Sequence, residues 1–167
     1  RNTRLKWRHK KMIRVLFICH GNICRSPMAE FLLKHMVREQ GLQDQFQIAS
    51  AATSREEIGN PVYPPARRKL AELGISTTGK TAVQMAKSDY DKYDYVIVMD
   101  ENNMRNALRL VGRTRTEAAK LHKLLDFADK HGDIADPWYT GDFDTAFSEI
   151  EKGCSGFLEH LKKEGMI

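Results

Sequence analysis

Cysteine is scarce in this sequence of 167 residues, which contains three cysteines: Cys19, Cys24 and Cys154. A fold held together by disulfides needs an even and larger set, so an odd count argues against such a framework. Thiols that stay reduced are typical of a cytoplasmic protein, and a reduced thiol is free to react. We therefore expect a cytoplasmic protein in which at least one cysteine carries chemistry.

Long hydrophobic runs and low-complexity tracts are also missing. No stretch approaches the roughly 18 apolar residues that a membrane span needs, and the beginning of the chain lacks the apolar core of a signal peptide. Apolar residues make up 41% of the sequence, enough for one buried core in a chain of this length. The expectation is one globular domain without a membrane partner.

An excess of positive charge is present only at the start of the sequence. The formal net charge is +5, but six of the 27 basic residues precede Met12, which leaves 21 against 22 acidic residues. A basic N-terminal segment before a neutral domain has two interpretations. It is either an arm that binds nucleic acid or a membrane surface, or an extension left by an expression vector or by a start assigned too early. We favour the second interpretation, with residues 1–11 an extension, residues 12–167 the domain, and no nucleic-acid partner.

Short β-prone apolar runs alternate along the chain with stretches of helical periodicity. Such alternation is typical of an α/β fold with a mostly parallel sheet covered on both faces. We expect a single-domain three-layer sandwich around a four-stranded, mostly parallel twisted sheet. The predicted strands are 15–18, 46–52, 95–99 and, less clearly, 121–125; the predicted helices are 27–40, 64–73, Asn102 or Asn103 to 111, and 144–164.

The loop after the first strand has the composition of a phosphate-binding loop. Cys19 ends the strand and faces the start of the helix that opens at Pro27, where free amides present about half a positive charge. This environment favours a nucleophilic thiolate, and Ser26 can donate a hydrogen bond to it. In an α/β sheet, ligands bind beyond the carboxyl ends of the strands, which is where this loop lies.

The residues inside the loop suit a phosphate group. Gly21 and Asn22 tolerate the left-handed backbone that turns successive amides inward, and Arg25 can clamp two phosphate oxygens. A thiolate could then attack phosphorus in line without a metal or another cofactor. The simpler alternative, a buried strand-end cysteine beside a surface arginine, leaves the flanking residues unexplained.

The sequence resembles the low-molecular-weight protein tyrosine phosphatases from about Ile13 to the C-terminus. Their signature, Cys-x5-Arg-Ser, corresponds here to residues 19–26, and three further motifs follow in order: Ser50-Ala51-Ala52, Val98-Met99-Asp100 and Asp136-Pro137-Trp138-Tyr139. The resemblance implies a monomer that hydrolyses phosphotyrosine in proteins, and small aryl phosphates, through a phosphocysteine. It also implies that Cys19 is the nucleophile, Arg25 the phosphate clamp, Asn22 the residue that stiffens the loop and Ser26 the stabiliser of the thiolate.

Asp136 is the candidate acid. A positioned carboxylic acid that protonates the leaving group contributes about 10² to 10⁴ in rate. Pro137 keeps the backbone of Asp136 extended, and Trp138 and Tyr139 could form the walls of a slot for an aromatic ring. By itself Asp-Pro before aromatics is usually only a turn; the resemblance favours the catalytic interpretation.

Other residues near these motifs have less definite roles. Asp100 either supports the site from the end of the third strand or only caps the next helix. Cys24 either forms a reversible disulfide with Cys19 or is a small buried residue, and Cys154 is interpreted as structural. His20 and Ile23 complete the loop, His20 as a possible charge at the site or as a solvated side chain.

Two positions depart from the resembled family. Glu56 stands where many members carry an aromatic residue opposite the slot, which leaves the peptide preference open. The Gly79-Lys80 stretch lacks a histidine that some members use to brace the loop asparagine, so Asn22 needs another partner, for which Ser50 is the candidate.

Three rival functions remain. A phosphoarginine phosphatase of the same fold is the first, although Ile23 replaces a small hydroxyl residue and the aromatics favour an aryl phosphate. An arsenate reductase is the second, but it needs two further thiols close in sequence and Cys154 is alone. A non-catalytic phosphate or nucleic-acid binder is the third, and an intact set of Cys19, Arg25 and Asp136 argues against it.

Overall fold

The computed structural model describes residues 12–112, 114 and 116–167. The predicted extension, residues 1–11, lies outside the described residues.

Four parallel strands form the central sheet. They are β1 (Ile13–Cys19), β2 (Phe46–Ala52), β3 (Tyr95–Val98) and β4 (Leu121–Lys123), in the spatial order β2-β1-β3-β4. Within the described residues, the strands of this sheet pair only in parallel, whereas the isolated bridge between Pro61 and Thr81 is antiparallel. The expected mostly parallel sheet is confirmed. The fourth strand is shorter than predicted because residues from Leu124 onward turn into a 3₁₀ helix, η2 (Leu124–Phe127), and pack into the core.

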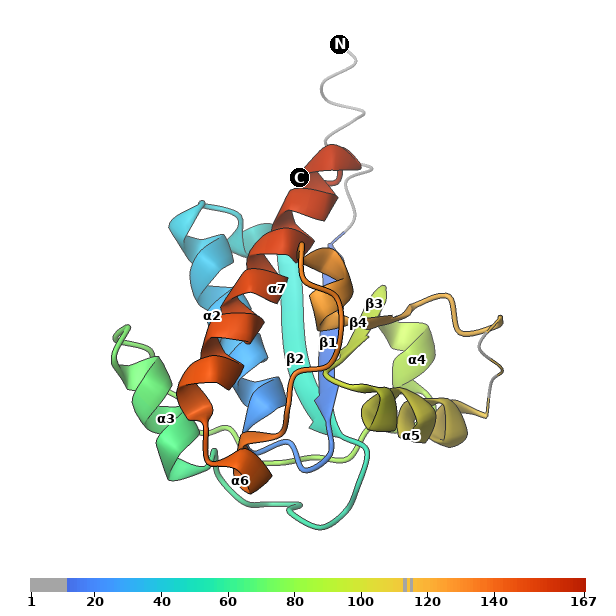
Figure 1. The fold of residues 1–167 in the computed structure, drawn as a ribbon. Helices are drawn as coiled ribbons and strands as arrows, with labels where there is room; N and C mark the ends of the chain where they lie inside the picture. Colours follow the sequence, from blue (N-terminus) through green and yellow to red (C-terminus); the bar gives the residue numbers. More distant parts are fainter. Residues whose placement is uncertain (1–11, 113, 115) are drawn as a thin grey trace.

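Helices cover both faces of the sheet, as Figure 1 shows. Side chains of β1 alternate: Val15 and Phe17 belong to one buried cluster, Leu16 and Ile18 to the other, as the two-residue period of a strand requires. The first cluster is covered by α2 (Arg25–Glu39), α3 (Pro64–Ala71) and α7 (Phe143–Lys163), the second by α4 (Asp89–Lys92) and α5 (Glu101–Val111). The short helices η1 (Gln43–Gln45) and α6 (Pro137–Thr140) complete the elements of the described chain. The predicted three-layer sandwich is confirmed.

Three helix starts differ from the sequence prediction. That of α7 differs by one residue, since the helix begins at Phe143. α2 begins at Arg25 rather than Pro27, because a proline without an N–H is tolerated in the first turn, whose amides have no partner within the helix. α5 is capped by Asp100 and not by Asn102 or Asn103: the Asp100 carboxylate accepts from the Asn103 amide at 2.7 Å. A carboxylate at this position also compensates the positive end of the helix dipole.

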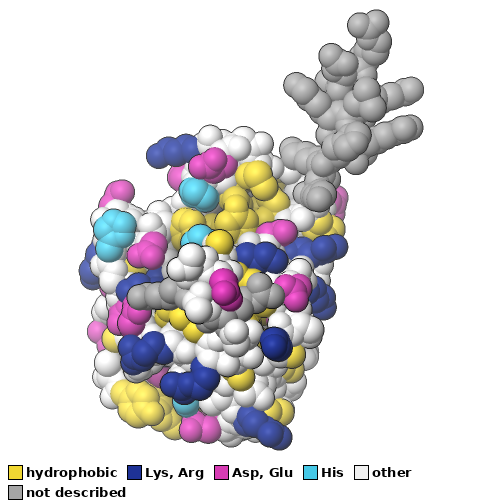
Figure 2. Space-filling view, turned by 90° about the vertical axis from the view of Figure 1, so that its right-hand side faces the viewer, with side chains coloured by type: hydrophobic (Ala, Val, Ile, Leu, Met, Phe, Trp, Pro, Cys, Tyr) yellow, Lys and Arg dark blue, Asp and Glu magenta, His cyan; other side chains and the backbone are white. Residues whose placement is uncertain are grey.

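The surface carries charges of both signs. On the face turned to the viewer in Figure 2, basic and acidic side chains are interspersed and neither sign forms a continuous patch. Among the described residues, none of the helices is both long enough and apolar enough to cross a bilayer.

Candidate active site

The loop between β1 and α2 folds into a cradle of backbone amides. Asn22 has φ 60°, the left-handed conformation expected at this position. Among the described residues we find no acceptor for the backbone N–H groups of Gly21, Ile23 and Cys24. α2 starts at this loop without an acidic residue in its first turn and without a side-chain cap. The positive end of the helix is therefore available to an anion.

Cys19 lies at the base of the cradle, and two backbone amides and one hydroxyl surround its sulfur. The amides of Asn22 and Ser26 donate to Sγ at 3.3 and 3.4 Å, and the Ser26 hydroxyl lies 3.0 Å from it. Hydrogen bonds to the charged form of a thiol stabilise that form. The geometry favours a thiolate at Cys19.

Arg25 is almost fully buried beside the cradle. Its Nη1 donates to Asp100 Oδ2 at 2.6 Å and to the Ile134 carbonyl at 2.8 Å, and its Nη2 donates to Asp136 Oδ2 at 3.3 Å. Burial alone would lower the pKa of Arg25, but the negative charges of Cys19, Asp100 and Asp136 outweigh it and raise the pKa. Asp100 thus has both roles considered from the sequence, since one carboxylate oxygen caps α5 and the other holds Arg25.

The Arg25 guanidinium retains donors for an incoming anion. No described residue accepts from its Nε, and one N–H of Nη2 is left beside the bond to Asp136. A guanidinium presents these two donors side by side, which matches two oxygens of a phosphate group.

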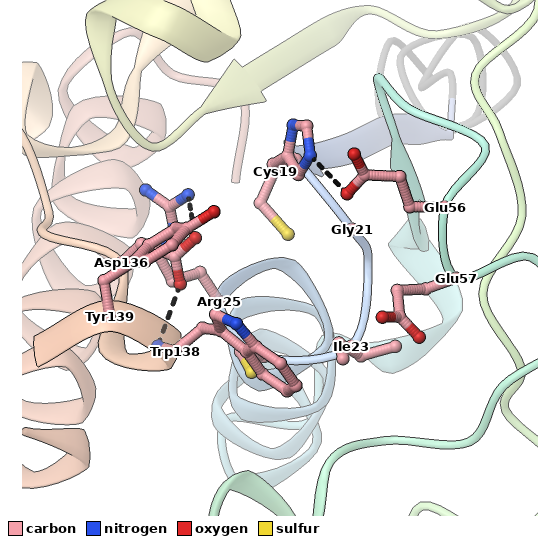
Figure 3. A pocket seen from close by; sticks show the side chains of 11 residues that line it. Cys19, Gly21, Ile23, Arg25, Glu56, Glu57, Asp136, Trp138 and Tyr139 are labelled. Carbon is pink, nitrogen blue, oxygen red and sulfur yellow. Dashed lines mark hydrogen bonds and ion pairs between the residues drawn. The ribbon is translucent and has the colours of Figure 1, made fainter. Parts of the chain in front are cut away.

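Asp136 lies on the wall of the same pocket, across from the loop, as Figure 3 shows. Its Oδ1 accepts from the Trp138 amide at 3.0 Å, which caps the short helix α6, and its Oδ2 faces Arg25. The cap holds the carboxylate in one orientation. The sequence motif and the structure therefore agree that Asp136 and Cys19 share one pocket.

The pocket above Cys19 has a volume of about 150 Å³. Trp138 and Tyr139 line one side; Glu56 and Glu57 line the opposite side, as Figure 3 shows. Trp138 packs against Tyr63 with the ring centres 4.8 Å apart, whereas Tyr139 is 81% exposed. His20 also lines the pocket, and its Nε2 lies 2.8 Å from the Glu56 carboxylate.

A hydrogen-bond network behind the loop holds Asn22. Its Nδ2 donates to Ser26 Oγ at 2.7 Å and to Ser50 Oγ at 2.9 Å, so the contact expected with Ser50 is present. The Val83 amide donates to Asn22 Oδ1 at 3.2 Å. Ser50 in turn donates to the buried Glu30 at 2.5 Å.

Sequence reasoning missed several contributors: Glu30, Glu57, Lys80 and the backbone of Val83 and Ile134. Glu30 had a usable signal, since it is a charged residue among the apolar positions Met28, Ala29, Leu32 and Leu33 of α2. Nothing in the sequence marks a backbone amide such as that of Val83.

The other two thiols have different surroundings. Cys24 lines the pocket but is 4% exposed, and burial raises the pKa of its thiol. Cys154 is fully buried in α7 within the core, where burial likewise raises its pKa. Cys154 is therefore structural, as predicted, and offers no relay for an arsenate reductase. A disulfide between Cys19 and Cys24 stays a prediction, and all three cysteines are free here.

A parallel sheet whose first strand ends in a thiol, an amide cradle and a buried arginine defines the class of α/β proteins that bind phosphate groups at a cysteine-containing loop. Comparison with known proteins identifies the family. The family model described as "Low molecular weight phosphotyrosine protein phosphatase" matches residues 14–166. The chain therefore belongs to the low-molecular-weight phosphotyrosine protein phosphatase family.

Individual relatives agree with this assignment. The chain is 37% identical to the low-molecular-weight protein-tyrosine-phosphatase YfkJ of Bacillus subtilis over 93% of this chain and 100% of the relative. The crystal structure of YfkJ superposes with a TM-score of 0.88, covering 93% of this chain and 98% of that one. The human low-molecular-weight phosphotyrosine protein phosphatase is 37% identical over 87% and 93% of the two chains. A Drosophila arginine phosphatase has the same fold, with a TM-score of 0.81 and 29% identity over 90% and 98% of the two chains.

Proposed function

We propose that residues 12–167 form a phosphatase domain that hydrolyses phosphotyrosine in proteins, and small aryl phosphates, through a phosphocysteine at Cys19. The observation that carries the proposal is the surroundings of the Cys19 sulfur. Two backbone amides and one hydroxyl converge on it at the base of a pocket whose walls hold Arg25 and Asp136. Membership of the family supports the same activity.

The first step is transfer of the phosphoryl group to sulfur. The Cys19 thiolate attacks phosphorus, the S–P bond forms, and the bond between phosphorus and the tyrosine oxygen breaks. Asp136 gives its proton to the leaving oxygen, which departs as tyrosine. The cradle amides and the free donors of Arg25 hold the three equatorial oxygens as their charge develops.

The second step is hydrolysis of the phosphocysteine. Asp136, now a carboxylate, takes a proton from a water molecule whose oxygen attacks phosphorus. The S–P bond breaks, inorganic phosphate leaves, and Cys19 is again a thiolate stabilised by Ser26 and two amides. Both steps use the same residues, so the reaction needs no metal and no other cofactor.

The aromatic wall supports an aryl substrate. Trp138 and Tyr139 present ring surface beside the pocket, and an aromatic ring of the substrate can pack between them and the loop. Phosphoarginine is the second candidate, because the acidic side chains of Glu56 and Glu57 could accept from a guanidinium. Ile23 in the loop favours the aryl substrate.

The protein is proposed to act as a monomer in the cytoplasm. The nucleophile Cys19, the phosphate clamp Arg25 and the acid Asp136 line one pocket of a single copy, which therefore contains the whole catalytic set. Three free thiols fit a reducing compartment.

The test is hydrolysis of p-nitrophenyl phosphate near pH 6 in excess chelator by the wild type, Cys19→Ser and Asp136→Asn. Phosphotyrosine and phosphoarginine peptides of matched sequence are assayed beside it. We expect turnover by the wild type, loss of activity in Cys19→Ser, a kcat about 10² to 10⁴ lower for peptide in Asp136→Asn, and preference for phosphotyrosine. An active Cys19→Ser variant would refute the mechanism, and preference for phosphoarginine would refute the substrate class.

A further inference from the structure

The segment that follows α3 is fixed against the phosphate-binding loop. Thr81 pairs with Pro61 and Gln84 with Ala52 as isolated bridges. The Ala52 amide donates to the Val83 carbonyl at 2.7 Å, and the Val83 amide donates to Asn22 Oδ1. The segment therefore lies along the carboxyl end of β2, directly behind the loop that holds Cys19.

Lys80 enters this region with its ammonium group largely shielded from water. Its Nζ donates to the Ser50 carbonyl at 2.9 Å and lies 3.7 Å from Glu30 Oε1, with 13% of the Lys80 side chain and 6% of the Glu30 side chain exposed. Burial lowers the pKa of Lys80, while Glu30 and the charge of a thiolate at Cys19 act in the opposite direction. Lys80 therefore contacts the two residues, Ser50 and Glu30, that support the loop from behind.

Each hydrogen bond in the network between Glu30 and Cys19 has a defined donor and acceptor. An ionised carboxylate only accepts hydrogen bonds, so Ser50 donates to Glu30 and must accept from Asn22. The Val83 amide fixes the orientation of the Asn22 amide group, which donates to both serines. Ser26 Oγ accepts from Asn22, and beside a Cys19 thiolate, which has no proton to donate, the Ser26 hydroxyl is the donor to the sulfur.

We propose that Lys80 is a positioning residue of the reaction: by holding the Ser50 backbone and the Glu30 carboxylate, it fixes the direction of the hydrogen bonds that end at the Cys19 sulfur. The proposal deepens the proposed function and rests on it. Without the ammonium group, the buried Glu30 loses a counter-ion and Ser50 loses a backbone anchor. The last hydrogen bond, from Ser26 to the thiolate, then weakens.

The test measures the thiolate directly and without substrate. The rate at which iodoacetamide alkylates Cys19, identified by peptide mass spectrometry, is followed from pH 4 to pH 9 for the wild type and Lys80→Gln. We expect the pH midpoint of alkylation to rise by about 0.5 to 1 unit. With p-nitrophenyl phosphate at pH 5, we expect a three- to tenfold lower kcat and less than a twofold change in KM.

Three further variants separate positioning from charge and from damage to the fold. Lys34→Gln removes a cation that also pairs with Glu30, at 2.6 Å, but is not bonded to Ser50. The pH midpoint of alkylation should move in Lys34→Gln by less than half of the shift in Lys80→Gln. Lys80→Arg keeps a charged donor, so its pH midpoint of alkylation should lie close to that of the wild type. Lys152→Gln changes an exposed lysine of α7 and should leave both measurements unchanged. The other titratable and charged groups around the nucleophile are kept in every variant: His20, Cys24, Arg25, Glu56, Glu57, Asp100 and Asp136.

The outcomes distinguish this proposal from the proposed function. A midpoint in Lys80→Gln equal to that of the wild type, with hydrolysis intact, would refute the role of Lys80 alone. An equal shift in Lys34→Gln would also refute it, because the effect would then be one of charge and not of the contact with Ser50. Absence of phosphatase activity in the wild type would instead refute the proposed function. Circular dichroism melting curves show whether Lys80→Gln folds. If it does not fold, Lys80→Arg is measured in its place, and its pH midpoint of alkylation must then stay near that of the wild type.

Discussion

The hydroxyl oxygen of Ser26 lies 3.0 Å from the sulfur of Cys19. Ser26 Oγ also accepts from Asn22, and its own proton can be donated to a sulfur without a proton, which stabilises a thiolate more than a thiol. We expect Ser26→Ala to lower kcat for p-nitrophenyl phosphate about tenfold at pH 5, in line with loss of one hydrogen bond to a charged group. The deficit should shrink as pH rises, because more of the thiol ionises without help.

The control for this prediction is Ser155→Ala, an exposed serine of α7, which should keep wild-type kcat throughout. A deficit in Ser26→Ala that is the same at pH 5 and pH 8 would contradict a role in thiolate stabilisation. It would point instead to a role later in the reaction.

The carboxylates of Glu56 and Glu57 face the pocket from the side opposite Trp138. They should repel acidic residues next to the phosphotyrosine, although both are accessible to water and each contributes at most about 1 kcal/mol. We expect Glu56→Gln/Glu57→Gln to raise kcat/KM about two- to fivefold for a peptide with flanking glutamates at low ionic strength. The value for p-nitrophenyl phosphate, which has no flanking residues, should change less.

Glu72→Gln, which removes an exposed carboxylate at the end of α3, is the matched control and should have no effect on either substrate. The ratio of kcat/KM for the glutamate-flanked peptide to kcat/KM for a neutral peptide is compared between the double variant and the wild type. If this ratio is the same in both, the two side chains do not select the substrate.

Cys154 gives the stability of the fold a dependence on alkaline pH. Burial raises the pKa of its thiol, so the folded chain keeps a proton that the unfolded chain loses above about pH 8.5. The folded state then binds more protons, and the free energy of unfolding falls as pH rises. Between pH 7 and pH 10 the wild type should lose about 2 kcal/mol more than Cys154→Ala in urea unfolding. Equal losses in the two proteins would show that the thiol ionises in the folded state.

Gly156 marks the closest approach between α7 and η2. A Cβ at this position would overlap with the carbonyl of Phe127, which no small rearrangement relieves because the obstacle is backbone. Gly156→Ala should therefore destabilise the protein by about 2 kcal/mol, although alanine normally stabilises a helix relative to glycine. Ser155→Ala, one residue away, should change stability by less than about 0.5 kcal/mol. A Gly156→Ala variant as stable as the wild type would mean that η2 packs more loosely.

The sheet and the phosphate-binding loop were predictable because their signals are local. Residues 15–19 of β1 alternate between two buried clusters, and residues 19–26 contain the nucleophile, the turn residues and the clamp in one stretch. The short run at 121–125 was harder, since Leu124 and Leu125 are as apolar as strand residues but bury themselves from η2.

The support behind the loop was not predictable in the same way. Lys80 lies 30 residues from Ser50, and the Val83 amide lies 61 residues from Asn22; these contacts exist only because the segment after α3 lies along β2. The cap role of Asp100 is local and was one of the sequence alternatives, whereas its second contact, from Oδ2 to Arg25, joins residues 75 positions apart.

The central claim, that Cys19 carries the phosphoryl group, can be tested by trapping it. Asp136→Asn should form the intermediate from p-nitrophenyl phosphate, whose leaving group needs no proton, but should hydrolyse it slowly because no carboxylate activates water. Acid quenching within the first turnover, followed by mass spectrometry, should find one phosphoryl group on the peptide that contains Cys19 and none on Cys19→Ser. A phosphoryl group on another residue, or turnover by Cys19→Ser at the wild-type rate, would contradict the mechanism.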